Sequence, residues 1–372
     1  MVYSSYYVKE IHIRVGTFVS DAGYGGPVES LSVLTVDNPF LSFDEQLEAM
    51  LSNLHDVVEG DGTPVFMRFF LSDPANQAGV LKNHLSYDCP VSVIGQAPLN
   101  GTKIAALVWC RPWAKVQRTD GGLFKVSERN IDEYWFTGGV SGKEGAYSQT
   151  VSLLDELSAE LESQGLTLES NCMRTWLFVN NIDLNYRDVV EGRNDVFDRH
   201  GLTPETHFIA STGIEGSTGR PHNKVMLDAV AVSGPGAMVK YLQGASHLNR
   251  TSEYGVRFER GTVIKYPDRK HVYISGTASI DNKGRILYEG DVARQTKRMI
   301  ENVETLLSEA GCGFDEVGAM IIYLRDSADY AIVNEIFNAH FPDCPRVIVQ
   351  APVCRPGWLV EMECIAITRV TL

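Results

Sequence analysis

The sequence predicts an α+β protein built from three tandem copies of one unit, each a β-sheet with helices on one face. Three observations predict it. A Cys-Pro to Gln-Ala-Pro segment occurs twice, as "CPVSVIGQAPL" from Cys89 and "CPRVIVQAP" from Cys344. Three amphipathic segments align on a glutamine, and glycine-containing strands, "YWFTGGVSG" and "VYISGTASI", open the last two copies. The chain has 372 residues, enough for two or three domains.

The first helix of each copy is predicted from segments that align on Gln46, Gln149 and Gln295. Apolar residues recur four, five and eight positions after each glutamine: Met50, Leu51 and Leu54; Leu153, Leu154 and Leu157; Met299, Ile300 and Val303. This spacing places them on one face of a helix. The second and third helices run into "SQG" and "EAG", which favour helix termination.

Each helix is followed by an apolar strand, a second helix and a closing pair of strands. The strands are expected at 65–73, 172–180 and 318–326, and the closing pairs at 91–110, 206–232 and 346–368. The unit therefore reads β-β-α-β-α-β-β, and the copies are predicted to span 1–116, 131–236 and 253–372. Such alternation predicts sheets with helices on one face. Three copies in one chain can cover the other faces around a pseudo-threefold axis.

Composition narrows the function classes. The net charge of −14 disfavours nucleic-acid partners. No apolar run reaches the ~18 residues of a membrane span, and the N-terminus lacks a signal-peptide layout, so we expect a cytoplasmic protein without membrane partners. The seven cysteines include no CxxC, and the histidines lack ligand spacing. Neither metal nor organic cofactor is expected.

Copy three carries charges in its closing hairpin that copy one lacks: Arg346, Arg355, Glu361 and Glu363. Charged residues mostly avoid cores. Arg346 could hold a substrate carboxylate beside Glu361, whose burial would favour proton exchange near neutral pH. Alternatively, Arg346 and Glu361 form an internal ion pair that closes the hairpin. The residues alone leave both interpretations open.

The third copy resembles a Rid/YjgF-superfamily domain, of the endoribonuclease L-PSP family. The resemblance rests on "SGTASID", "GDVARQTKRMIENVETLLSEAG", "VGAMIIYLRDSADYAIVNEIFNAHF", "PRVIVQ" and "LVEMECIAI". It implies a chorismate-mutase-like fold, a trimer fused into a pseudo-trimeric monomer, and small-molecule clefts between copies. It also implies that Arg346 binds a substrate carboxylate, Asn334 lines the cleft and Glu361 handles protons. The position of Arg346 is expected to correspond to His207 in copy two and to Val91 or Ser92 in copy one. The position of Glu361 is expected to correspond to Met226 in copy two and to Ala105 in copy one.

A helix in copy two also carries polar residues on its apolar face. Tyr186, Val190, Arg193 and Phe197 share that face. Taken alone, Arg193 could snorkel to an edge carboxylate and Tyr186 could be an interface aromatic. The region resembles the chorismatases, a branch of the same superfamily. The matching residues are Tyr186-Arg187…Gly192-Arg193, "SGTAS" with Gly276 and Thr277, and Cys354-Arg355…Val360-Glu361-Met362-Glu363.

The resemblances imply three possible functions. The first is chorismatase-like hydrolysis of an enolpyruvyl ether or similar unsaturated carboxylate, between copies two and three. In it, Arg193, Tyr186 and either Arg346 or Arg355 bind substrate, and Glu361 donates the proton. The second is Rid-type deamination of 2-imino acids, using Arg346, Asn334 and Glu361. The third is metabolite binding without catalysis.

Overall fold

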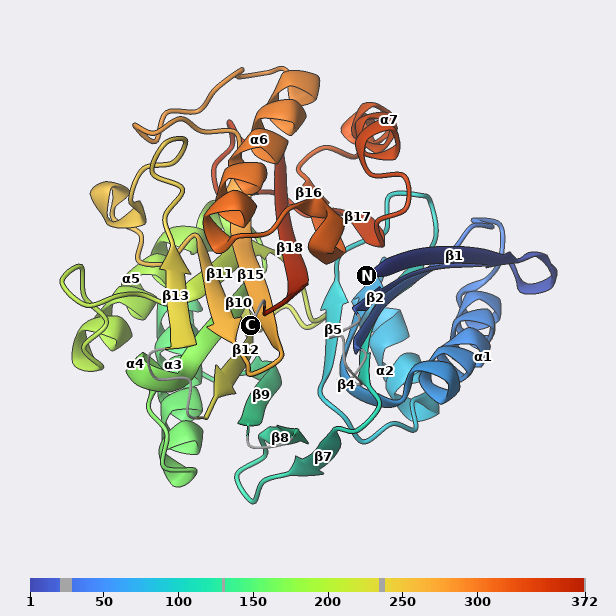
Figure 1. The fold of residues 1–372 in the computed structure, drawn as a ribbon, viewed down its shortest axis with the longest axis horizontal. Helices are drawn as coiled ribbons and strands as arrows, with labels where there is room; N and C mark the ends of the chain where they lie inside the picture. Colours follow the sequence, from blue (N-terminus) through green and yellow to red (C-terminus); the bar gives the residue numbers. More distant parts are fainter. Residues whose placement is uncertain (21–28, 129–130, 234–237, 371–372) are drawn as a thin grey trace.

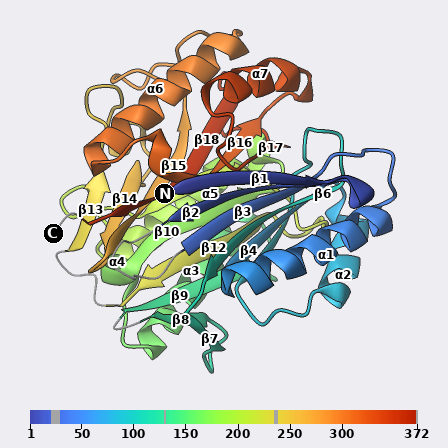
Figure 2. The ribbon, with the colours of Figure 1, turned by 45° about the vertical axis from the view of Figure 1, so that its right-hand side comes forward.

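Three six-stranded mixed sheets lie around a common axis, one for each predicted copy, with the helices on the outside (Figure 1, Figure 2). The computed structural model describes residues 1–20, 29–128, 131–233 and 238–370. In Figure 1 helices α6 and α7 lie at the top, α1 and α2 at the right, and α3 to α5 at the lower left. The α+β class and the three tandem units are thus as the sequence predicts.

Copy 1 forms a sheet in the order β1-β2-β3-β6-β4-β5. Its elements are β1 (Val2–Val8), β2 (Ile13–Ser20), β3 (Glu29–Val36), α1 (Phe43–Asp61), β4 (Thr63–Leu71), α2 (Pro74–His84), β5 (Val91–Gly95) and β6 (Ile104–Arg111). Strands β4 and β5 are parallel, because α2 connects them. The other neighbouring pairs are antiparallel.

Copies 2 and 3 repeat this order as β11-β10-β12-β9-β8-β7 and β13-β14-β15-β18-β16-β17. Copy 2 contains β7 (Lys115–Arg118), β8 (Phe124–Glu128), β9 (Ile131–Val140), α3 (Ala146–Ser163), α4 (Leu168–Asn171), β10 (Cys172–Val179), α5 (Ile182–Arg199), β11 (Ala210–Glu215) and β12 (Val225–Val232). Copy 3 contains β13 (Val239–Leu242), β14 (Gly261–Lys265), β15 (Arg269–Ala278), α6 (Val292–Ala310), β16 (Val317–Leu324), α7 (Tyr330–His340), β17 (Arg346–Gln350) and β18 (Val360–Arg369).

Each copy has one strand more than the predicted unit. The additional edge strands are β1, β7 and β13. Because β7 and β8 join the second sheet and β13 joins the third, those sheets begin before the expected starts at 131 and 253. The edge strands are short or largely exposed, so they lack the continuous apolar pattern that marks a buried strand.

The repeated glutamine has a structural role that is the same in every copy. The buried amide of Gln295 donates to Gly357 O at 2.9 Å and accepts from Leu359 N at 3.0 Å. Gln46 accepts from Lys103 N at 2.8 Å, and Gln149 accepts from Lys224 N at 2.7 Å. Each glutamine therefore ties the start of the outer helix to the loop that precedes the last strand.

The three copies pack head to tail in a ring. Strand β11 of copy 2 packs on β15 of copy 3, β16 of copy 3 on β2 and β3 of copy 1, and β5 of copy 1 on β9 of copy 2. At the centre, Phe66 of copy 1 stacks on Trp135 of copy 2, with ring centroids 4.6 Å apart. Trp176 continues the stack, 6.4 Å from Trp135. The sheet faces that the helices do not cover are thus buried against one another.

A buried ionic chain also joins all three copies. Arg68 of copy 1 lies 2.9 Å from Asp228 of copy 2 and 3.6 Å from Glu363 of copy 3. Arg174 of copy 2 binds the other side of Glu363 at 2.6 Å. These four side chains carry two positive and two negative charges, so the buried charge is balanced across the junction of the copies.

Two further findings concern the sequence expectations. The seven cysteines are free thiols. Among the helices of the described residues, none has both the length and the apolar character needed to cross a membrane.

We expect Gln295→Leu to lower the free energy of unfolding by about 2–4 kcal/mol, because Gly357 O and Leu359 N would lose their buried partners. Urea denaturation measures this. Gln117→Leu, at an exposed position of β7, serves as the control. Equal stability of the two variants would show that the glutamine contacts contribute nothing.

Candidate functional site

The strand ladders define which residues of the three copies correspond. Glu361 pairs with Tyr323 of β16, and its counterparts Met226 and Ala105 pair with Phe178 and Phe70. Those glutamate counterparts are as the sequence predicts. Met320, Thr175 and Met67 lie three residues before Tyr323, Phe178 and Phe70. They pair with Arg346, Ser211 and Val91, respectively. The counterpart of Arg346 in copy 2 is therefore Ser211 and not His207.

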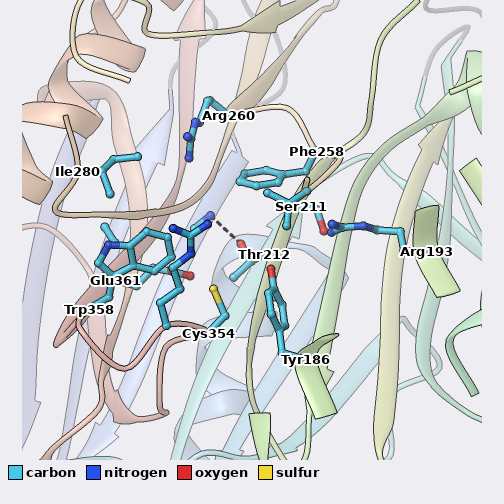
Figure 3. Close-up of a pocket in the computed structure, with 15 residues that line it drawn as sticks. Tyr186, Arg193, Ser211, Thr212, Phe258, Arg260, Ile280, Cys354, Trp358 and Glu361 are labelled. Carbon is cyan, nitrogen blue, oxygen red and sulfur yellow. Dashed lines mark hydrogen bonds between the residues drawn. The ribbon is translucent and has the colours of Figure 1, made fainter. Parts of the chain in front are cut away.

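A pocket lies between copies 2 and 3, and we call it the 2/3 pocket (Figure 3). The space between its side chains, including the part open to solvent, is about 560 Å³. Copy 2 contributes Tyr186, Arg193, Ser211, Thr212 and Gly213. The opposite wall is formed by residues of copy 3: Val256, Phe258, Arg260, Gly276, Ala278, Ile280, Cys354, Arg355, Trp358 and Glu361. Five of the expected site residues therefore meet here: Glu361, Arg355, Arg193, Tyr186 and Gly276.

Arg346 and Asn334 line a different pocket, between copies 3 and 1, which we call the 3/1 pocket. Its copy 1 wall includes Arg14, Gly16 and Thr35. The sequence placed Arg346 beside Glu361 because it predicted that their strands form one hairpin, but β16 lies between β17 and β18 in the sheet. In the fold, however, β17 is the edge strand next to copy 1, whereas β18 is internal and carries Glu361 to copy 2. The expected set is thus split between two clefts, and the internal Arg346–Glu361 ion pair does not form.

The guanidinium of Arg346 forms hydrogen bonds with residues of its own copy. Its Nη1 donates to Phe341 O at 2.6 Å and to Cys344 O at 3.1 Å, and its Nη2 donates to Asn338. These contacts close the connection between α7 and β17. Thr277, the remaining expected site residue, is buried and donates to Ser275 O at 2.9 Å, and it is outside the described lining of the 2/3 pocket.

Glu361 is a buried acid facing the 2/3 pocket. Burial raises its pKa to about 8, and the negative charge of Glu363 adds to this, against the opposing effect of Arg174 and Arg260. The carboxylate lies close to the backbone of Gly276, where a Cβ atom would stand 2.2 Å from Oε1. A larger residue at position 276 would therefore displace the Glu361 carboxylate from this position. A carboxyl group with this pKa holds its proton at neutral pH.

Three arginines line the same pocket. Arg193 projects from α5 and is 2% exposed, with its guanidinium 5.9 Å from the ring centre of Phe197. Arg355 stacks on Trp358 at 4.9 Å. Arg260 is 4% exposed and donates to Asn249 O at 3.1 Å. Such planar forks bind carboxylates in a bidentate manner.

Arg260 is a residue of the 2/3 pocket that the sequence did not indicate. It lies in the basic stretch "RTSEYGVRFERG", just before β14, where no motif or periodicity distinguishes it from a surface arginine. Only the packing of copy 3 on copy 2 brings it to the pocket beside Phe258 and Ser211 (Figure 3).

The pocket also contains hydroxyl and thiol groups. In Figure 3 the tyrosine hydroxyl of Tyr186, the sulfur of Cys354 and the side chain of Thr212 lie around one space. Burial raises the pKa of the Cys354 thiol to about 12, with the charge of Glu361 adding to it. The thiol is therefore neutral at physiological pH and is a poor nucleophile. Among the described residues, no group of histidine, cysteine, aspartate and glutamate side chains could hold a metal ion.

The chemistry of the 2/3 pocket follows from these groups. One carboxylic acid that keeps its proton at neutral pH faces arginines from two walls. The arginines favour a ligand with carboxylates, and the acid can protonate that ligand.

Stability should depend on pH through Glu361. Its folded-state pKa of about 8 is above the ordinary 4.5, so between these values the folded state binds more protons and loses stability as pH rises. Glu361→Gln should therefore be more stable than the wild type at pH 8.5, by up to about 3 kcal/mol, and much closer to it at pH 5. Urea unfolding at both pH values checks this, with Glu48→Gln at an exposed site as control. A pH-independent difference would contradict it.

Comparisons with known proteins agree with this fold. Residues 262–368 match the family model described as endoribonuclease L-PSP. The 3-aminoacrylate deaminase RutC of Acinetobacter baylyi is 34% identical over 97 residues, covering 26% of this chain and 77% of the relative. The 3-hydroxybenzoate synthase of Streptomyces hygroscopicus is 29% identical over 284 residues, covering 68% of this chain and 81% of the relative. A crystal structure of a chorismatase superposes with a TM-score of 0.65 at 19% identity, over 83% of this chain and 94% of that one.

Proposed function

We propose that this chain, which belongs to the Rid/YjgF family that the endoribonuclease L-PSP model describes, is a chorismatase-type hydrolase. Its substrate would be an enolpyruvyl ether with two carboxylates, such as chorismate, and one product would be pyruvate. The observation that carries the proposal is the neutral acid Glu361 facing arginines on both walls of the 2/3 pocket. The similarity to a 3-hydroxybenzoate synthase over most of the chain supports it.

The arginines suit a dianionic substrate. Arg193 approaches from α5 in copy 2, while Arg260 and Arg355 approach from copy 3. Two carboxylates at opposite ends of one molecule would thus meet cations on opposite walls. The substrate carboxylates would also neutralise the arginines. The arginines would then not repel the positive charge that develops on the substrate during the reaction.

Glu361 would act as the general acid. Its proton is transferred to the terminal CH₂ carbon of the enol ether, which leaves an oxocarbenium ion at the ether-bearing carbon. Water adds to that carbon, and the hemiketal then breaks its bond to the ring oxygen, releasing pyruvate and the ring alcohol. The water that adds gives one proton back to the ionised Glu361, and the hydroxyl proton of the hemiketal passes to the ring oxygen as that bond breaks. An acid that is protonated near the working pH is the form that this first step needs.

Glu361→Gln should lower kcat for pyruvate release from chorismate by at least about 10³-fold with little change in KM, because the amide keeps the shape but cannot donate the proton. Lactate dehydrogenase with NADH measures pyruvate continuously. Glu335→Gln, at an exposed site on α7, is the control. Full activity of Glu361→Gln would end the proposal.

Substitution of the arginines separates the two pockets. Arg193→Met and Arg260→Met should each raise KM by about 10–100-fold, because each removes a carboxylate contact. Arg346→Met should leave kcat/KM within about threefold, because Arg346 lies in the 3/1 pocket. Steady-state kinetics decide this, and thermal melting confirms that the variants are folded. Loss of chorismate turnover in folded Arg346→Met would place the reaction elsewhere.

A second candidate is deamination of 2-imino acids. It is favoured by the similarity of copy 3 to a 3-aminoacrylate deaminase and by the presence of Arg346, Asn334 and Tyr330 in the 3/1 pocket. Against it, the acid Glu361 lies in the other pocket. Ammonia release from an imino acid generated in situ, abolished by Arg346→Met, would support it. Ligand binding without either turnover would instead indicate a metabolite-binding protein.

A further inference from the structure

Two buried carboxylates lie on β18, one lining the 2/3 pocket and one outside its described lining. Glu361 and Glu363 are two residues apart on β18, so they project from the same face of this internal strand. Both are 4% exposed. Glu361 faces the pocket, whereas Glu363 lies deeper, at the junction of the three copies.

Glu363 is fixed by donors from the other copies. Arg174 Nη2 lies 2.6 Å from its Oε2, and Trp176 Nε1 donates to its Oε1 at 2.8 Å. Thr212 donates its hydroxyl proton to Glu363 at 2.5 Å. Arg68 of copy 1 is 3.6 Å away. These partners hold the Glu363 side chain in one position.

Thr212 links this carboxylate to the acid. With its one proton given to Glu363, its oxygen accepts from Arg174 at 2.5 Å and from Gly276 N at 2.9 Å. All its hydrogen-bonding capacity is therefore used. Gly276 is the residue against which the Glu361 carboxylate packs. The contacts run without a break from Glu363 through Thr212 and Gly276 to Glu361.

We propose that Glu363 is a positioning residue for the general acid: its negative charge, fixed by copies 1 and 2, favours the protonated, acid-competent form of Glu361. This inference rests on the proposed function. It makes the reactivity of an acid in copy 3 depend on the interlocking of all three copies.

The electrostatics agree in direction. After burial, the charge of Glu363 is the largest contribution that raises the pKa of Glu361. Arg174 and Arg260 oppose it. The other titratable or charged groups around Glu361 come from three elements: Tyr323 on β16, Tyr186 and Arg193 on α5, and Cys354 and Arg355 in the loop before β18.

Copy 2 provides a matched control. Asp228 pairs with Trp176 as Glu363 pairs with Ile321, so the two acids occupy equivalent ladder positions. Asp228 is also fully buried and binds the same Arg68 at 2.9 Å. It is not among the charges that act on Glu361. Asp228→Asn therefore disturbs the same ionic chain without removing the charge in question.

The test is the pH profile of kcat/KM for pyruvate release from chorismate. In the wild type, activity should fall at high pH as Glu361 loses its proton. In Glu363→Gln, this descending limb should move down by about one pH unit or more, because the repelling charge is gone. Asp228→Asn should lower the melting temperature but leave the limb in place. A limb that stays fixed in Glu363→Gln, or that moves equally in Asp228→Asn, would overturn the inference.

A second variant decides the matter if Glu363→Gln does not fold. Arg174→Gln combined with Glu363→Gln removes one buried charge of each sign and leaves Arg68 paired with Asp228, so the buried charge stays balanced. Because the charge of Glu363 acts on the pKa of Glu361 more strongly than that of Arg174, the limb should still move to lower pH. A limb that is unchanged or moves to higher pH would contradict the inference.

The outcomes also separate this inference from the proposed function. If Glu361→Gln still releases pyruvate, the proposed acid is wrong and both ideas fail. If Glu361→Gln is inactive but Glu363→Gln keeps the wild-type limb, only the role of Glu363 is wrong.

Discussion

The structure depends on the burial of three sheet faces against one another at the pseudo-threefold axis. A sheet covered by helices on one side only leaves its other side apolar, and among the described residues each copy packs that side against the other two copies. The stacked Phe66, Trp135 and Trp176 supply the apolar contact. The chain of Asp228, Arg68, Glu363 and Arg174 supplies fixed polar partners across the same junction. Removing one partner would leave a buried charge uncompensated, so the junction also selects one mutual arrangement of the copies.

This constraint places the candidate sites between copies. A pocket at such a junction takes one wall from each neighbour, so equivalent positions within one copy serve different pockets. Arg346 therefore belongs to the 3/1 pocket and Glu361 to the 2/3 pocket. A chain that encodes each copy separately can change one wall without changing the others. Ser211 stands where copy 3 has Arg346, and Met226 and Ala105 stand where it has Glu361.

The same junction relates stability to chemistry. Glu361 is buried because β18 is an internal strand facing a neighbouring copy, and burial is the main reason that its pKa is raised. The cost is a protein that is less stable at high pH than it would be with a neutral side chain there. Such a cost is typical of groups retained for function.

Local patterns in the sequence were enough to predict the three copies, their outer helices and the strand that carries Glu361. Those features depend on residues that are close in the chain: an apolar stripe, a repeated glutamine, a glycine-containing strand and an acid in a β-strand. The edge strands β1, β7 and β13 escaped prediction because exposed edges need little apolar character. Arg260 and the separation of Arg346 from Glu361 were decided by the tertiary structure alone. Which side chains share a pocket depends on how whole copies pack, and two strands that are consecutive in the chain can face different neighbours when another strand lies between them, as β16 lies between β17 and β18.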